Sequence, residues 1–308
     1  MAMNQFQYQH APSDQSNKIT IGVIALAIIL FFAILAWPRA TPKPAQSMTA
    51  SETVTPVLGP TQLGGKLNDN NTQAYLATLH RVKPLRSEAL HRQAESAMSE
   101  GAGRETLAVL VLSANDRDLE QDLADLMRAD VAHVEKLLAM LQTGATALSR
   151  EAPQYCKLSA YDAHRGSTIG QVSNTLMSNF AYGSRGYDWL IRFDRMLLEA
   201  IEDGRNNPKS YGRLTPTDLT ALQTMGTQML TGRHLSKLTR LQSEPPQVRR
   251  DAIENMNLCE MLAEALPAVK RLPEATKGRA MNEIARAADA GVLDFGLILE
   301  FASSSRAD

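Results

Sequence analysis

A long uncharged segment near the N-terminus constrains this chain more than any other feature. Residues 19–37 read ITIGVIALAIILFFAILAW and contain no charged side chain. As an α-helix they would span about 28 Å, close to the hydrocarbon thickness of a bilayer. Lys18 and Trp37 flank the run with residue types that favour a membrane interface. A cleaved signal peptide usually has a shorter apolar run and a small-residue cleavage site, and the flank AWPRATPKP offers no convincing site. The segment therefore predicts a single transmembrane helix in contact with the lipid bilayer.

Residues 38–71 predict a flexible, proline-rich tether, because prolines recur among Ser, Thr, Gly and Asn with little apolar content. The basic residues on the two sides of the anchor balance, so they do not set its orientation. A short tail (1–18), one anchor, a tether and a large domain (72–308) are typical of an exported, membrane-tethered protein. We therefore expect a single-pass protein of the bacterial inner membrane, with its tail in the cytoplasm and its C-terminal domain in the periplasm.

The two cysteines, Cys156 and Cys259, allow three interpretations: a disulfide, a thiolate paired with His164, or part of a metal site. In an oxidising compartment two cysteines most simply form one disulfide. It would close a loop of about a hundred residues, for which chain entropy gives at most about 4.7 kcal/mol. His164 follows Cys156 by eight residues, so on one helix the two side chains would lie too far apart to touch. The sequence predicts the disulfide, and no metal site.

Helical periodicity dominates the large domain and predicts a mainly α, helical-bundle-like fold. One amphipathic helix is expected from residue 115 to a stop at Gly144, and a second over 185–204. Residues 72–99 are expected to be helical and split at Pro84.

Three further helices are marked by their ends. One begins at Pro216 after a Thr215 cap, one follows Pro246 with Cys259 near its middle, and one runs from Pro273 to Gly291. The apolar stretches 106–114 and 291–301 fit either a buried strand or a buried helix. The polar stretch 203–216 is a candidate boundary between two lobes.

Aromatic and charged residues gather between positions 155 and 211 and form the candidate interaction or ligand region. Aromatic side chains with arginines are frequent anchors of partner surfaces, although large aromatics also build cores. Asp194 falls on an apolar helix face, where a carboxylate must be paired, protonated or functional. The candidate residues are Tyr161, Asp162, His164, Arg165, Tyr182, Arg185, Tyr187, Trp189 and Asp194.

Familiar catalytic and nucleotide-binding motifs, such as GxxxxGK[ST], GxGxxG, HExxH and GxSxG, are absent from the sequence. Glu88 and His91 have the Glu-x-x-His spacing of di-iron bundles, but the required second copy is missing. The 32 Lys and Arg residues nearly balance 33 Asp and Glu residues, unlike the basic footprint of a nucleic-acid binder. We therefore predict no cofactor, no catalytic residue and no nucleic-acid partner.

These features favour a structural or interaction component of a cell-envelope complex, with other membrane or periplasmic proteins as partners. The alternative is a membrane-tethered periplasmic enzyme that acts on a cell-wall glycan or peptide, with Asp162 or Asp194 as acid or base. A ligand sensor is a third hypothesis, which an eighteen-residue tail without an output domain disfavours.

Overall fold

The computed structural model describes residues 61–114, 119–151, 153–157, 180–230 and 257–290, with short pieces at 244–245, 247–248, 251–252 and 255. Across these ranges the fold is mainly α, as predicted, and contains no β-strand; Lys157 and Asn257 form one isolated bridge. The helices are α2 (Thr61–Lys66), α3 (Asn70–Val82), α4 (Pro84–Ser99), α5 (Arg104–Ser113), α6 (Leu119–Arg128), α7 (Val131–Glu151), the 3-10 turn η1 (Pro153–Cys156), α9 (Arg185–Asn206), α10 (Pro216–Leu230), α13 (Leu258–Lys270) and α14 (Glu274–Asp289).

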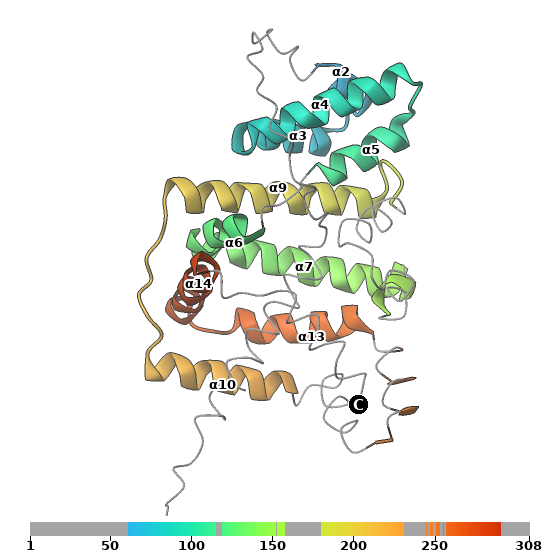
Figure 1. Ribbon diagram of the computed structural model, residues 1–308. Helices are drawn as coiled ribbons and strands as arrows, with labels where there is room; N and C mark the ends of the chain where they lie inside the picture. The colour runs from blue at the N-terminus through green and yellow to red at the C-terminus, as the bar shows by residue number, and fades with distance from the viewer. Residues whose placement is uncertain are drawn as a thin grey trace, which may run out of the picture.

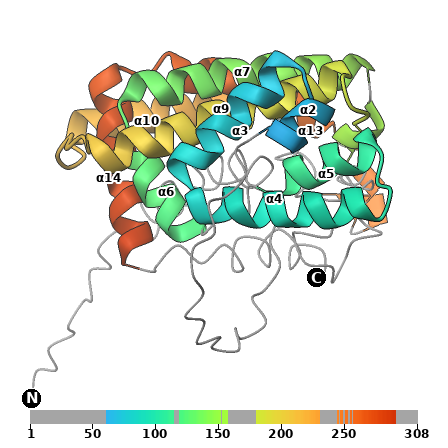
Figure 2. The ribbon, with the colours of Figure 1, turned by 90° about the horizontal axis from the view of Figure 1, so that it is seen from above.

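The helices are stacked in layers. Figure 1 shows α3 and α4 above α9, then α6 and α7, then α13, and finally α10 at the opposite side. The pairs α3–α9, α6–α9, α7–α13 and α10–α13 are in direct contact, which links successive layers. Helix α14 packs against α6 and lies at one end of the stack, as the view from above also shows (Figure 2). Helix α10 is therefore an outer layer supported by α13 and α14.

Folded structure begins earlier than the predicted end of the tether at residue 71. Helix α2 covers Thr61–Lys66, and Leu63 and Leu67 are fully buried in the core. Asp69 then caps α3 by accepting a hydrogen bond from the amide of Thr72 at 2.8 Å. The tether boundary was placed too late because a single helical turn with two apolar residues resembles a linker in the sequence. The predicted tail (1–18), the predicted anchor (19–37) and residues 38–60 lie outside the described residues.

The helix predicted from residue 115 to Gly144 is instead two helices, α6 and α7, separated at Ala129 and Asp130. Asp130 ends the continuity because its side chain accepts a hydrogen bond from the amide of Ala132, at 3.0 Å, and caps α7. Gly144 does not stop α7, which continues to Glu151. A Cβ at Gly144 would lie 2.3 Å from the Trp189 ring, so this glycine makes room for a neighbouring helix.

Other local expectations are confirmed or refined. Pro84 separates α3 from α4, and the ambiguous apolar stretch 106–114 falls largely within helix α5. Cys259 lies in the first turn of α13, not near the middle of a helix, because Asn257 caps that helix by accepting a hydrogen bond from the amide of Glu260. Residues 291–301 lie outside the described part of the chain.

Cys156 and Cys259 form the predicted disulfide, with their Cα atoms 5.2 Å apart. Cys156 belongs to η1, directly after α7, and Cys259 to the start of α13. The bridge therefore fastens α13 to the end of α7, the helix on which it packs. Because 103 sequence positions separate the two residues, it restricts a large part of the unfolded chain.

Within the described ranges, no helix is both long enough and apolar enough to cross a bilayer. The buried apolar residues form one large cluster, to which α2, α3, α4, α5, α6, α7, α9, α13 and α14 all contribute. A second, small cluster joins α10 to the end of α13 through Leu222, Met225, Met229, Ala268 and Leu272. The helical stack thus has one main core and one thin apolar contact at the α10 layer.

Candidate functional site

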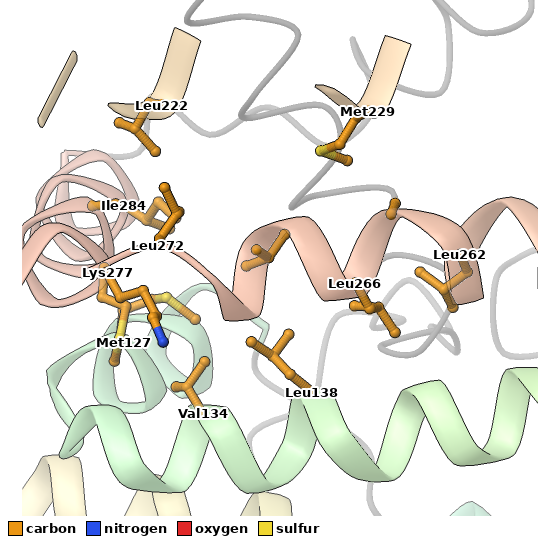
Figure 3. Close-up of a pocket in the computed structure, with 14 residues that line it drawn as sticks. Met127, Val134, Leu138, Leu222, Met229, Leu262, Leu266, Leu272, Lys277 and Ile284 are labelled. Atoms are coloured by element: carbon orange, nitrogen blue, oxygen red, sulfur yellow. The ribbon is translucent and has the colours of Figure 1, made fainter. Parts of the chain in front are cut away.

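An apolar groove among the described residues lies beneath α10, and we call it the α10 groove. Figure 3 shows Leu222 and Met229 of α10 on one side of α13, and Leu262 and Leu266 of α13 pointing to its other side, toward Leu138 of α7. Packing leaves a cavity of about 60 Å³ in this groove. Its lining is formed by Met127, Val134, Leu138, Leu222, Met229, Leu262, Ala265, Leu266, Val269, Leu272, Lys277, Ala280, Met281 and Ile284.

Lys277 is the charged member of this apolar lining. Only 8% of its side chain is exposed, and its ammonium group donates hydrogen bonds to Glu135 and to the carbonyl oxygen of Lys270. A buried ammonium needs such partners because an unpaired buried charge is strongly unfavourable. Glu135 is 45% exposed, so this ion pair lies between the apolar groove and solvent. The groove therefore offers a large apolar wall with one positive group at its edge.

The N-terminus of α10 is fixed to α14 by the buried carboxylate of Asp218. Arg279 donates two hydrogen bonds to it, at 2.6 and 2.8 Å, and the hydroxyl of Thr276 donates a third at 2.7 Å. Thr215 completes the network: its amide and hydroxyl donate to Asp218, and its hydroxyl accepts from the Asp218 amide. The Arg279 guanidinium holds the pKa of Asp218 well below its usual range, and together with the smaller effects of the Thr215 and Thr276 hydrogen bonds it outweighs the cost of burial.

The loop before α10 is attached to the same helix. The side chains of Asn282 and Arg286 donate to the carbonyl oxygen of Gly212, at 2.7 and 3.2 Å. The ring of Tyr211 lies over Gly278, where a Cβ would come within 2.3 Å of it. The stretch 203–216, a candidate lobe boundary, thus packs closely against α14 and holds one end of α10 in place.

The outward face of α10 carries no charged side chain. Leu219 is 38% exposed, and Thr220, Gln223, Thr224 and Thr227 are also exposed. The three threonine hydroxyls each donate to the carbonyl oxygen four residues earlier, at 2.9–3.1 Å. Because these hydroxyls already have hydrogen-bond partners within the helix, a partner protein could bury this face without leaving their O–H groups unpaired. We call this surface the neutral α10 face.

The predicted aromatic region contributes mainly to packing in its described part. Tyr187 is fully buried, and its hydroxyl lies 2.9 Å from the Thr72 hydroxyl. Burial raises the pKa of Tyr187 well above its ordinary value. Tyr182 packs edge-on against Tyr187 with ring centroids 5.3 Å apart, and its amide donates to Glu105. These tyrosines join the start of α9 to α3 and α5.

Trp189 stacks on Phe193 at 5.4 Å and donates its indole N–H to the carbonyl oxygen of Met140 at 3.1 Å. Asp194 is 4% exposed within the same helix, and Arg185 is exposed at its start. None of the five described candidates, Tyr182, Arg185, Tyr187, Trp189 and Asp194, belongs to the groove lining. Tyr161, Asp162, His164 and Arg165 lie outside the described residues.

Sequence reasoning did not identify the α10 groove or Lys277 as a site. The groove combines five helices that are distant in sequence, and each of them shows only an ordinary apolar stripe. One signal was available: between Pro216 and Leu230 the sequence contains a single charged residue, Asp218. Such a composition is unusual for the exposed face of an amphipathic helix.

The described residues contain no group of three or more His, Cys, Asp or Glu side chains arranged to hold a metal ion. His91 of the Glu-x-x-His pair lies on α4, where its Nδ1 is 2.6 Å from the carbonyl oxygen of Ser87. No protein-family model matches this chain, and neither does any curated protein or any solved structure.

Proposed function

We propose that this chain is a membrane-anchored, exported helical protein that serves as a structural or interaction component of a cell-envelope complex. The observation that carries the proposal is the neutral α10 face, on the outermost layer of the stack. Cores of protein interfaces are depleted of charged residues, and this face presents threonine, glutamine and leucine side chains. We therefore assign the partner surface to α10.

Two further features support the exported, membrane-tethered location. The uncharged segment 19–37 has the length of a membrane-spanning helix. The disulfide between Cys156 and Cys259 is typical of proteins that fold in an oxidising compartment. Between the anchor and α2 the chain has residues 38–60, which could extend to about 80 Å at full stretch. That length lets the helical stack reach partners at a distance from the membrane surface.

The test is affinity purification of the full chain from membranes solubilised in mild detergents. We expect partner proteins to be recovered with the wild type. We expect recovery to fall at least about tenfold with Gln223→Arg and Thr224→Arg together, because a loss of about 1.4 kcal/mol is tenfold in affinity. The matched control is Gln93→Arg with Ser96→Arg, which adds the same charges to an exposed part of α4.

Recovery of the chain alone in every detergent would contradict the interaction role, and equal recovery with both double variants would contradict the assignment to α10. The location is tested separately by fusing, at the C-terminus, a reporter enzyme that is active only after export. Activity confined to a cytosolic reporter at the same position would rule out a periplasmic domain.

A further inference from the structure

We infer that the α3–α4 corner, which we define as residues 80–92, binds the surface of a bilayer that contains anionic lipid. This placement deepens the proposed function and rests on it, because the membrane anchor at 19–37 is what brings the corner to lipid. It orients the helical stack, with α3 and α4 toward the membrane and α10 toward partner proteins. It also names the lipid that this side of the molecule contacts.

Leu85 is the apolar side chain that the corner leaves in water. It is 78% exposed, against 48% for Val248 and 38% for Leu219, the other exposed large apolar side chains of the described ranges. Pro84, the first residue of α4, is exposed beside it. The inward position of this first turn is taken by Ser87, which is fully buried. Leu85 therefore projects away from the core and can be buried only by a separate surface.

The corner is attached to two neighbouring helices and presents Leu85 at a fixed position. Arg81 donates two hydrogen bonds of 2.7 Å to Glu202 of α9. Lys83 forms an ion pair with Asp122 of α6 in which both side chains are largely buried. An apolar side chain on a rigid support loses little conformational entropy when it binds, so most of its burial contributes to the contact with lipid.

The charge of the corner suits an anionic surface. Its sequence contains four Lys or Arg residues and one acidic residue, Glu88. Arg92 is exposed and follows Leu85 by seven residues, so both side chains lie on one face of α4, about 10 Å apart along its axis. Basic residues beside an exposed apolar side chain favour a bilayer interface with anionic headgroups.

The chain enters the stack on this same side. Residues 38–60 lead into α2, which contacts α4 in the layer opposite α10 (Figure 1). Even at a full extension of about 80 Å they hold the domain at an effective concentration on the order of a millimolar at the membrane. Burying one leucine strengthens binding roughly 10- to 100-fold, and each basic residue near anionic lipid roughly fivefold. Contacts of this size are sufficient for a tethered domain.

Spin labelling of the full chain in lipid vesicles tests this inference. The two native cysteines are joined in the disulfide, so a cysteine introduced at Ala89 or at Thr224 takes the nitroxide label alone. Ala89 lies one turn after Leu85, and Thr224 on the outward face of α10 is the matched control. In vesicles of phosphatidylcholine and phosphatidylglycerol, we expect the label at Ala89 to be shielded from a water-soluble nickel complex and accessible to dissolved oxygen. The label at Thr224 should remain accessible to the nickel complex.

Two substitutions separate the apolar contact from the charge. Leu85→Asp should lower the ratio of shielded to unshielded label at Ala89 at least about tenfold, because it removes the leucine side chain from lipid. Arg92→Gln should lower the ratio roughly fivefold, and only in vesicles that contain phosphatidylglycerol. Thr143→Asp adds a negative charge at an exposed position of α7 and should leave the ratio unchanged. Equal unfolding midpoints for these variants and the wild type show that the domain remains folded.

The inference is overturned if the label at Ala89 is as accessible to the nickel complex as the label at Thr224, or if Leu85→Asp leaves it shielded. Equal shielding in vesicles of phosphatidylcholine alone overturns the assignment to anionic lipid. Shielding that requires a high ratio of protein to lipid also overturns it, since a second copy of the chain would then cover the corner. Flotation of the full chain with the vesicles tests the anchor separately. A chain that floats without shielding contradicts this inference alone, and a chain that does not float contradicts the proposed membrane anchor as well.

Discussion

The contact between α6 and α9 and the contact between α10 and α13 hold their helices in different ways. At Gly204 the backbones of α9 and α6 approach so closely that a Cβ would lie 1.7 Å from the carbonyl oxygen of Asp125. The buried carboxylates of Asp122 and Asp125 beside it are paired with Lys83 and Arg205. Helix α10 instead meets α13 through a few apolar side chains, its buried ion pair lies at its N-terminal end, and Gln228 near its other end accepts one exposed hydrogen bond from Arg271.

The difference separates a rigid part of the molecule from an adaptable one. Helices α6 and α9 are in direct backbone contact, and buried ion pairs connect them to the end of α3. These helices therefore keep one arrangement, because a displacement would leave buried charges without partners. Flexible side chains such as Met225 and Met229 tolerate small shifts, because methionine packs well in irregular spaces. An outer helix whose buried ion pair lies at its N-terminal end can therefore shift more readily than α9.

Removing the disulfide should have the largest effect, because it takes away the covalent support of the α13 and α10 layers. With Cys156→Ala and Cys259→Ala together, we expect unfolding free energy to fall by about 4 kcal/mol, the scale for a loop of this length. Denaturant unfolding of the helical domain measures it. Thiol alkylation without reductant is the control: two labelled cysteines in natively prepared wild-type protein would show that the bridge does not form.

Gly204→Ala should be the next most damaging change, because it acts on the rigid contact. The added methyl group meets backbone atoms of α6, so the two helices must separate, at a cost of about 3 kcal/mol. Gly65→Ala is the matched control, since nothing lies within 4 Å of a Cβ there. Equal unfolding midpoints for the two variants in chemical denaturation would contradict the close approach of α6 and α9.

Tyr187→Phe should lower the free energy of unfolding by less, about 1 kcal/mol. It removes one buried hydrogen bond between α9 and α3, so the Thr72 hydroxyl loses its Tyr187 partner. Adding Thr72→Val removes the second polar group and should restore much of the loss. Chemical denaturation of both single variants and the double variant gives the coupling free energy. Additive single effects would mean that the two hydroxyls do not stabilise each other.

The sequence predicted local structure better than tertiary arrangement. Helix ends marked by Pro84, Thr215 and Pro273 were found because capping and proline geometry act within a few residues. The break at Asp130 and the continuation past Gly144 were missed, since contacts with α9 contribute to both. Asp203 accepts from the Asp130 amide in addition to the local cap on Ala132, and Trp189 covers Gly144.

The candidate site shows the same limit. Tyr187 and Trp189 were identified as a cluster from their spacing, but only packing reveals that one is fully buried and the other stacks on Phe193. The α10 groove could not be predicted, because its lining comes from α6, α7, α10, α13 and α14. The disulfide was predictable because the chain has two cysteines and one way to pair them.

Acid should weaken the α10 layer through Asp218 and leave the rest of the stack folded, the smallest of these effects. The pKa of Asp218 is lowered in the folded state by Arg279, so the unfolded state binds a proton first as pH falls. The contribution of the ionised carboxylate is therefore complete above the unfolded value of 3.8 and is lost as pH falls below it.

Hydrogen exchange between pH 5 and pH 3 measures this effect as the protection of the α10 amides, after correction for the intrinsic exchange rates. Asp218→Asn removes the titrating group, so the protection of the α10 amides should no longer fall with pH. The protection of the α9 amides should follow the same pH dependence as in the wild type. Arg279→Gln should raise the folded pKa of Asp218 toward its unfolded value and so reduce the pH-dependent loss of protection at α10. A profile at α10 that is the same in wild type and Asp218→Asn would mean that this carboxylate does not hold the helix, and the polar anchor at the start of α10 would have to lie elsewhere.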